Sequence, residues 1–242
     1  MKLMGKNALV TGSGQRVGRE IALGLAKRGC NLILHYHSSR EKAAETLLEI
    51  EACGVRAISV QADLRDQVEL KSLFSTVDSS FNRLDILVNS AAIMEKIDFL
   101  DVDGDAWYRS MALNLRAPFF CIQEATRQML PGKGVVINIS DVAGLRPWAS
   151  YPVHSISKAG VEMLTQVAAA AFAPDIRVNG VAPGPVMKPE FLDDDRWNEI
   201  GAAVPLQRSG NAGDVSRAVI FLCENDYITG ETLAVDGGNK LL

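Results

Sequence analysis

The chain has 242 residues, 48% of them hydrophobic, which is enough apolar material for one α/β domain over residues 1–242 with a full core. Its formal net charge of −4 excludes the broad positive field of a nucleic-acid-binding protein, and its four scattered cysteines form no Cys-x-x-Cys pair that would indicate a zinc site or a disulfide framework. No stretch reaches the ~20 apolar residues of a membrane span and the N-terminal run is too short for a signal peptide, so we expect a cytoplasmic protein without nucleic-acid, membrane or metal partners.

Short apolar runs rich in β-branched residues alternate with longer helical patterns along the chain. Most of these runs are continuously hydrophobic, which is typical of strands covered by helices on both faces. We expect strands over residues 7–11, 31–36, 57–62, 84–89, 135–140, 176–182 and 231–236. The alternation predicts a single-domain, Rossmann-like, doubly wound α/β fold with a mainly parallel seven-stranded sheet and right-handed crossovers.

The first expected strand leads into a glycine turn, TGSGQRVG, and then into a helix that Gly29 ends. Gly12, Gly14 and Gly18 allow a tight turn, and the start of a helix offers unpaired N–H groups and the positive end of its dipole. This arrangement predicts a cradle for the pyrophosphate of a dinucleotide. The alternative is that these are ordinary turn glycines, with Gly18 allowing close packing. The helix face toward the sheet is formed by Val17, Ile21, Ala22, Leu25 and Ala26.

The segment HYHSSR, after the second strand, bears on the choice between NAD and NADP. An enzyme for NAD places an acidic residue there against the ribose 2′-hydroxyl, and this segment has none. Arg16 adds a planar cation from the glycine turn. The segment itself supplies donors that suit a 2′-phosphate: His35, His37, Ser38, Ser39 and Arg40. We therefore expect NADP(H), with Ser38 or Ser39 also able to cap the next helix.

The longest stretch without helical or strand periodicity runs from Gly184 to Gly213. A long loop after a regular series of strands and helices often closes over a ligand. We expect residues 184–213 to form a substrate loop.

Taken together, the motifs resemble the short-chain dehydrogenase/reductase family over nearly the whole chain. The turn TGSGQRVG is similar to the family's glycine motif, with Arg16 in place of its middle glycine. QADL (61–64), LVNSAA (87–92) and VAPGPV (181–186) resemble its adenine-contacting, Asn-Asn-Ala-Gly and nicotinamide-contacting segments. The resemblance implies further cofactor contacts from Val17, Asp63, Leu64, Asn89, Ser90, Ala91, Pro183, Gly184 and Val186.

Within that family, the arginine of the glycine turn, the HYHSS stretch and Asp141 resemble pteridine reductases. Asp141 stands where most members have the catalytic serine. Ile93 and Met94 stand in the region where pteridine reductases place an aromatic residue against the pterin. The resemblance implies an NADP(H)-dependent reductase of a small carbonyl or imine-like substrate such as a pterin, with a 3-oxoacyl thioester as the alternative.

The stretch SYPVHSISKAG replaces the family's Tyr-x-x-x-Lys pair with His154 and Lys158. Their spacing places both on one face of a helix that Pro152 opens. Imidazole can act as a general acid near neutral pH; the Asp141 carboxylate favours its cationic form and the Lys158 ammonium its neutral form. We hypothesise that Asp141 and His154 form the proton-donating dyad while Lys158 binds the cofactor. Tyr151 is the alternative donor, and a site without an efficient donor is the third possibility.

Asn114, in MALNLRAPFF, resembles the family's helix-kinking asparagine, which helps to hold a proton-relaying water. The alternative is a helix asparagine satisfied by nearby backbone. The resemblance also implies a homo-oligomer, commonly a tetramer, in which helices around residues 105–130 and 152–172 pair. Two other functions stay open: a nucleotide-binding protein without turnover, and a lyase or dehalogenase that has lost the nucleotide and fills its cradle with side chains.

Overall fold

Seven strands form one sheet in which all neighbouring strands run parallel. The computed structural model describes residues 1–190 and 192–242. In spatial order, the strands are β3 (Ala57–Gln61), β2 (Asn31–Tyr36), β1 (Asn7–Val10), β4 (Ile86–Asn89), β5 (Gly134–Ile139), β6 (Ile176–Pro183) and β7 (Thr232–Val235). The predicted fold class is therefore confirmed, with strand ends within two residues of those expected.

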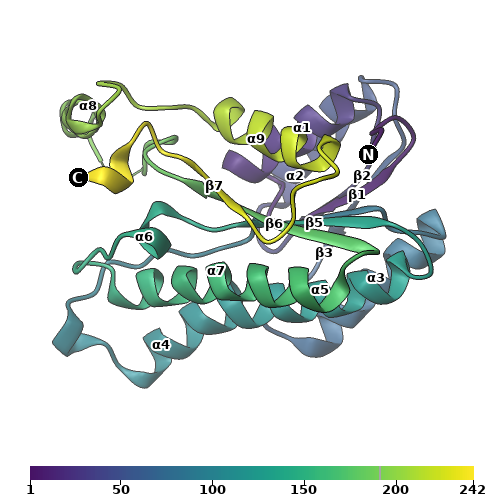
Figure 1. Ribbon diagram of the computed structural model, residues 1–242, viewed down its shortest axis with the longest axis horizontal. Coiled ribbons are helices and arrows are strands. Elements are labelled where there is room, and N and C mark those ends of the chain that lie inside the picture. Colours follow the sequence, from purple (N-terminus) through teal and green to yellow (C-terminus); the bar gives the residue numbers. More distant parts are fainter. Residues whose placement is uncertain (191) are drawn as a thin grey trace.

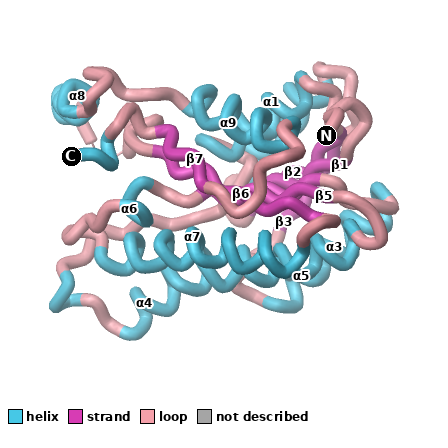
Figure 2. The backbone as a smooth tube through the Cα atoms, in the orientation of Figure 1, coloured by secondary structure: helices cyan, strands magenta, loops and turns pink. Residues whose placement is uncertain are grey.

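Helices cover both faces of this sheet (Figure 1). One layer contains α1 (Arg16–Lys27), α2 (Arg40–Glu51) and α9 (Ala212–Glu224), and the other contains α3 (Gln67–Phe81), α5 (Ala117–Met129) and α7 (Pro152–Phe172). Figure 2 shows the strands lying between these two helical layers. Three shorter helices complete the fold: α4 (Gly104–Met111), α6 (Val142–Leu145) and α8 (Asp194–Ala203). Across the described parts of the chain, no helix combines the length and apolar character needed to cross a bilayer.

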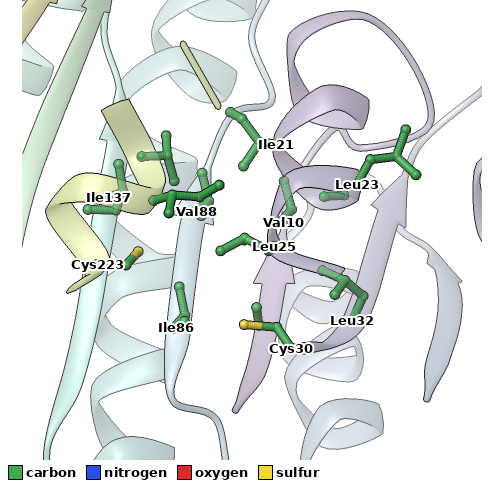
Figure 3. Packing of buried hydrophobic residues seen from close by; sticks show 14 of the residues in the cluster. Val10, Ile21, Leu23, Leu25, Cys30, Leu32, Ile86, Val88, Ile137 and Cys223 are labelled. Atoms are coloured by element: carbon green, nitrogen blue, oxygen red, sulfur yellow. The ribbon is translucent and has the colours of Figure 1, made fainter. Parts of the chain in front are cut away.

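Buried side chains on each face of the sheet pack against one helical layer. Figure 3 shows the cluster in which strand residues such as Val10, Ile86 and Ile137 meet Leu25 of α1 and Cys223 of α9. On the other face, alternate residues of the same strands pack against α3, α5 and α7. Because both faces are buried, the strands read as continuous hydrophobic runs in the sequence.

The parallel order brings the carboxyl ends of the strands to one edge. The order reverses direction between β1 and β4, since the chain passes from β1 outward through β2 and β3 and then returns to the other side of β1. In open α/β sheets, ligands bind in the crevice at such a switch point. The segments that follow β1, β4, β5 and β6 therefore converge at one place.

The expected substrate loop at 184–213 contains the helix α8, and its last residues already belong to α9. The Asp193 side chain caps α8 by accepting a hydrogen bond from the Arg196 N–H at 2.7 Å. No hydrophobic periodicity predicts α8, because Gly201 is its only buried residue among those described and the helix has no apolar stripe.

His35 has a different position from the one expected of a phosphate donor. Its Nδ1 accepts a hydrogen bond from the Gly12 N–H at 3.1 Å, and its Nε2 donates to the Ala62 carbonyl at 2.9 Å. Burial lowers the pKa of His35 to about 4, so the ring is neutral at physiological pH. His35 therefore fixes the glycine turn against β2 and β3, and the prediction that it donates to a phosphate is corrected.

We predict that His35 makes the fold sensitive to acid. The pKa of His35 is about 4 in the fold against an ordinary 6.5, so the unfolded chain binds the proton more readily between these values. The free energy of unfolding should fall as the pH falls from about 6.5 to 4, by up to about 3 kcal/mol. Urea unfolding of His35→Asn, which keeps an acceptor for the Gly12 N–H, should show a flatter dependence on pH.

Equal pH dependences for wild type and His35→Asn would contradict the assignment.

Candidate functional site

A cavity of about 1090 Å³ lies at the carboxyl edge of the sheet and extends from the glycine turn to the start of α7. Most of the candidate residues line it. From the sequence motifs these are Gly12, Arg16, Val17, Gly18, His35, His37, Ser38, Ser39, Asp63, Leu64, Ser90, Ala91, Asp141, His154, Lys158, Pro183, Gly184 and Val186. Gly14, Asn89 and Asn114 are not part of its lining.

The backbone of the glycine turn is packed too closely against neighbouring backbone for Gly12 and Gly18 to carry side chains. Gly12 has a φ of +64°, and a Cβ there would lie 2.9 Å from the Ala91 Cα. A Cβ on Gly18 would lie 2.3 Å from the Gly12 carbonyl oxygen. The Gln15 side chain makes no capping hydrogen bond at the start of α1, so the first N–H groups of this helix stay available to an anion.

Polar groups gather at the end of the cavity next to β2. Arg16 is exposed there and adopts a φ of +57°, the left-handed region in which the family has glycine. Ser39 occupies the N-cap position of α2 without forming a capping hydrogen bond, so its hydroxyl remains available to a ligand. His37 and Ser38 are exposed beside it. Together they can donate hydrogen bonds to an anion.

Asp63 has a partner that the sequence did not indicate. Arg65 donates to both of its carboxylate oxygens, at 2.8 to 3.1 Å, and these hydrogen bonds lower the pKa of Asp63 to about 2. The Nε2 of His37 lies 3.8 Å from the same carboxylate. Asp63 is therefore ionised and neutralised within the protein, and it adds little negative charge to this end of the cavity.

Thr11 holds the segment after β4 against the glycine turn, a role that no sequence motif predicted. Its Oγ1 accepts hydrogen bonds from the Ser90 and Ala91 N–H groups at 2.9 and 3.1 Å. The Asn89 side chain instead donates to Asn138 Oδ1 at 2.9 Å inside the sheet. The expected cofactor contact of Asn89 is therefore corrected with respect to its side chain, which has a structural role.

At the other end of the cavity, α7 presents His154 and Lys158 one helical turn apart. Pro152 is the first residue of α7 and Tyr151 its N-cap, so Tyr151 precedes the helix as expected. The Lys158 ammonium donates to the Ile139 carbonyl at 2.9 Å, and burial lowers the pKa of Lys158 to about 8. Both side chains are almost fully buried, and both line the cavity.

His154 and Asp141 lie together as hypothesised. The Nε2 of His154 is 3.6 Å from Asp141 Oδ2, an ion-pair separation slightly too long for a hydrogen bond. This Nε2 is buried and has no hydrogen-bond partner among the described residues. Asp141 caps α6 by accepting from the Ala143 N–H at 2.8 Å, which fixes its carboxylate. The arrangement places an imidazole nitrogen without a hydrogen-bond partner beside a carboxylate group, and both residues line the cavity.

Aromatic and apolar side chains surround the substrate end of the cavity. The rings of Trp148 and Tyr151 pack edge to face with their centroids 5.9 Å apart. The segment around α8 supplies further lining residues, Met187, Pro189, Leu192, Trp197 and Ile200. These residues all belong to the segment 184–213 in which the sequence predicts a substrate loop, and the folding of this segment brings them to the cavity.

Asn114 lies behind the cavity in a π-helical turn, Ala112–Arg116, between α4 and α5. Its Oδ1 accepts from the Ile93 N–H, and its Nδ2 donates to the Ile93 carbonyl, both at 2.9 Å. A π-helical turn therefore interrupts the α-helical pattern at the position where the resemblance implies a kink. The side chain, however, is bonded to backbone and does not reach the cavity. Within the described ranges, no group of three or more His, Cys, Asp or Glu side chains could hold a metal ion.

Comparisons with known proteins agree with this geometry. The family model described as enoyl-(acyl carrier protein) reductase matches residues 12–240. The 3-oxoacyl-[acyl-carrier-protein] reductase FabG of Staphylococcus aureus is 39% identical in an alignment that covers 97% of this chain and 98% of FabG. A short-chain type dehydrogenase/reductase of Picea abies is 33% identical in an alignment that covers 98% of this chain and 93% of that protein. The crystal structure of FolM alternative dihydrofolate reductase 1 from Brucella canis, complexed with NADP, is similar to this structure with a TM-score of 0.95 and a sequence identity of 28%. The superposition covers 100% of this chain and 96% of the FolM chain. The chain belongs to the short-chain dehydrogenase/reductase family of oxidoreductases.

Proposed function

We propose that the protein is an NADP(H)-dependent reductase of a small carbonyl or imine-like substrate, with His154 as proton donor. The observation that carries the proposal is the buried His154 Nε2, free of hydrogen bonds within the described chain, 3.6 Å from Asp141. Lys158 lies one turn further along the same helix and lines the same cavity. Reduction of a polar double bond adds a hydride and a proton, so the site needs a positioned proton donor beside the cofactor.

The cavity fits the proposed cofactor. Gly12 and Gly18 line the cavity, and the start of α1 has no side-chain cap, so its free N–H groups can bind a pyrophosphate. Arg16, His37, Ser38 and Ser39 then remain for the 2′-phosphate that distinguishes NADP from NAD. The similar Brucella canis structure is one complexed with NADP, which supports the same choice. An open cradle also argues against a lyase or dehalogenase that has lost its nucleotide.

The residues at the start of α7 have separate tasks in this reaction. The nicotinamide of the bound cofactor supplies the hydride. His154, as the imidazolium, donates its Nε2 proton to the substrate oxygen or nitrogen, and the Asp141 carboxylate stabilises that imidazolium before transfer. With a pKa of about 8, Lys158 is mostly protonated at neutral pH, so it offers a buried positive charge and a donor for the ribose.

The substrate end of the cavity supports a flat heterocycle such as a pterin. Ile93 and Met94 are not aromatic, but Trp148, Tyr151 and Trp197 supply rings from other segments. Flat aromatic surfaces favour stacking against a heterocycle. We also propose that the segment carrying α8 acts as the substrate lid. A 3-oxoacyl thioester is the second candidate, favoured by the 39% identity to FabG of Staphylococcus aureus.

We also propose that the protein forms a homo-oligomer, a tetramer as the family resemblance implies, in which a groove on α4, α5 and α7 forms one of the subunit interfaces. The groove has a volume of about 460 Å³, with Gly160 in its lining and apolar walls formed by Met111, Leu115, Phe119, Met163 and Val167. Met163 and Val167 are 58% and 55% exposed in the single chain. A continuous apolar patch of this kind is typical of a subunit interface, and the same helices of a second copy would bury it.

We predict that Arg16→Ala weakens NADPH binding by about tenfold to a hundredfold, the effect of losing one hydrogen bond to a charged group. NADH binding should stay within about twofold, because NADH lacks the 2′-phosphate. Fluorescence titration of both cofactors measures the difference. Arg56→Ala is the control, since Arg56 lies over Phe81, and it should change neither affinity. An equal loss for the two cofactors would contradict an NADP-specific role for Arg16.

We predict that His154→Phe lowers kcat for NADPH oxidation by about a hundredfold or more, because it removes the proton donor and keeps the ring volume. Tyr151→Phe should change kcat by less than about threefold. The assay uses a pterin, a 3-oxoacyl thioester and simple ketones at neutral pH. A large loss in Tyr151→Phe alone would identify Tyr151 as the donor. Tight NADPH binding without turnover on any of these substrates would identify a binding protein.

We predict that Met163→Asp combined with Val167→Asp dissociates the oligomer, because a charge buried in an apolar interface is costly. Light scattering after size-exclusion chromatography measures the mass directly. Leu48→Asp is the matched control, because Leu48 is 67% exposed on α2, and the variant should keep the wild-type mass. A monomeric wild type would overturn the oligomer proposal.

A further inference from the structure

The Ile93 carbonyl oxygen accepts two hydrogen bonds at the edge of the catalytic cavity. One comes from Asn114 Nδ2 at 2.9 Å, and the other involves His154 Nδ1 at 3.2 Å. A carbonyl oxygen has two lone pairs and no hydrogen to donate, so both partners must donate to it. This requirement bears directly on His154, because an imidazole nitrogen can either donate or accept.

The partners of His154 therefore assign its tautomer. With Nδ1 donating to Ile93, the neutral ring carries its proton on Nδ1 and a lone pair on Nε2. The opposite tautomer would direct a lone pair at the carbonyl oxygen 3.2 Å away and gain only the 3.6 Å contact with Asp141, which exceeds hydrogen-bond distance. The hydrogen bond to Ile93 decides between the two, and it leaves Nε2 as the atom that takes up and releases the second proton.

Asn114 fixes the position of the Ile93 carbonyl, the group that determines the tautomer of His154. Its Oδ1 accepts from the Ile93 N–H and its Nδ2 donates to the Ile93 carbonyl, so a single amide group fixes both backbone groups of Ile93. Nδ2 also donates to Ser157 Oγ at 3.1 Å, and Ser157 Oγ donates to the His154 carbonyl at 2.7 Å. Asn114 is thus connected to His154 through the Ile93 carbonyl and through the backbone of α7.

We propose that Asn114 is a positioning residue for His154: by holding the Ile93 carbonyl as an acceptor, it keeps the imidazole in the Nδ1–H tautomer with Nε2 toward Asp141 and the cavity. The inference rests on the proposed function only in making Nε2 the atom that exchanges a proton with substrate. The tautomer itself is a property of the folded chain and exists without turnover. A phenol at position 154 would have only one polar atom and no tautomers. The contact with the Ile93 carbonyl therefore has this effect only because the residue is a histidine.

The chain contains an internal reference for this tautomer. His35 accepts a hydrogen bond at Nδ1 from the Gly12 N–H and donates from Nε2 to the Ala62 carbonyl, so its neutral ring carries the proton on Nε2. The two buried histidines therefore have opposite tautomers, and the third, His37, is exposed. Long-range ¹H–¹⁵N NMR spectra of protein labelled with [¹⁵N]histidine distinguish the two forms, and His35→Asn and His37→Asn assign the signals.

The test is the ratio of the two tautomers of His154, measured at a pH where the ring is neutral. In wild type, we expect His154 to be predominantly Nδ1–H and His35 to be Nε2–H. In Asn114→Asp, an oxygen replaces the amide nitrogen that faces the Ile93 carbonyl and repels it. The ratio of Nδ1–H to Nε2–H at His154 should then fall by about fivefold, the effect of one lost neutral hydrogen bond. Asn114→Ala removes the same donor and provides the test if Asn114→Asp does not fold.

Ser110→Ala is the matched control, because Ser110 Oγ contacts the same Asn114 Nδ2 at 3.3 Å but not Ile93. It should leave the ratio unchanged. An Nε2–H tautomer of His154 in wild type would overturn the inference, and so would a ratio that is equal in wild type and the folded Asn114 variant. NADPH oxidation by wild type tests the proposed function separately: the assigned tautomer without turnover would contradict the reductase and leave the positioning role standing.

Discussion

The parallel pairing of β1 with β4 is the constraint on which the rest of this site depends. It places the ends of β1, β4, β5 and β6 at one edge, where the glycine turn, the segment after Asn89 and the start of α7 meet. Thr11 joins the first two of these by accepting from the N–H groups of Ser90 and Ala91. The cavity is therefore formed by backbone segments whose positions are fixed by the pairing of the strands, and their side chains line it.

The two buried histidines differ in the hydrogen-bond partners of their ring nitrogens. At His35, both ring nitrogens bond to backbone and burial lowers the pKa to about 4, so the ring acts as a neutral link between strands. At His154, one nitrogen contacts the Ile93 carbonyl and the other faces Asp141 without a hydrogen bond inside the described chain. The number of backbone hydrogen bonds, rather than burial, distinguishes the two histidines, since both are nearly inaccessible.

The burial of His154 determines which partners its ring requires. A phenol has a single polar atom, whereas an imidazole has two, and the second must be satisfied when the ring is buried. The Ile93 carbonyl meets this need, and Asn114 holds that carbonyl through the π-helical turn between α4 and α5. Lys158 keeps its place one turn further along α7, beside the Ile139 carbonyl.

The sequence by itself determined the fold class, the seven strands, the glycine turn and the juxtaposition of His154 with Lys158, because hydrophobic periodicity and helical spacing are local properties. Only the tertiary structure decided which polar groups face the cavity. In the fold, the Asn89 side chain donates a hydrogen bond to Asn138 inside the sheet, and the His35 ring accepts one from the Gly12 backbone. The tertiary structure also decided the position of α8, which buries too few residues to show a hydrophobic periodicity in the sequence. Hydrogen-bond partners distant in the chain, such as Ile93 and His154, are set by strand order and packing, which no single segment encodes.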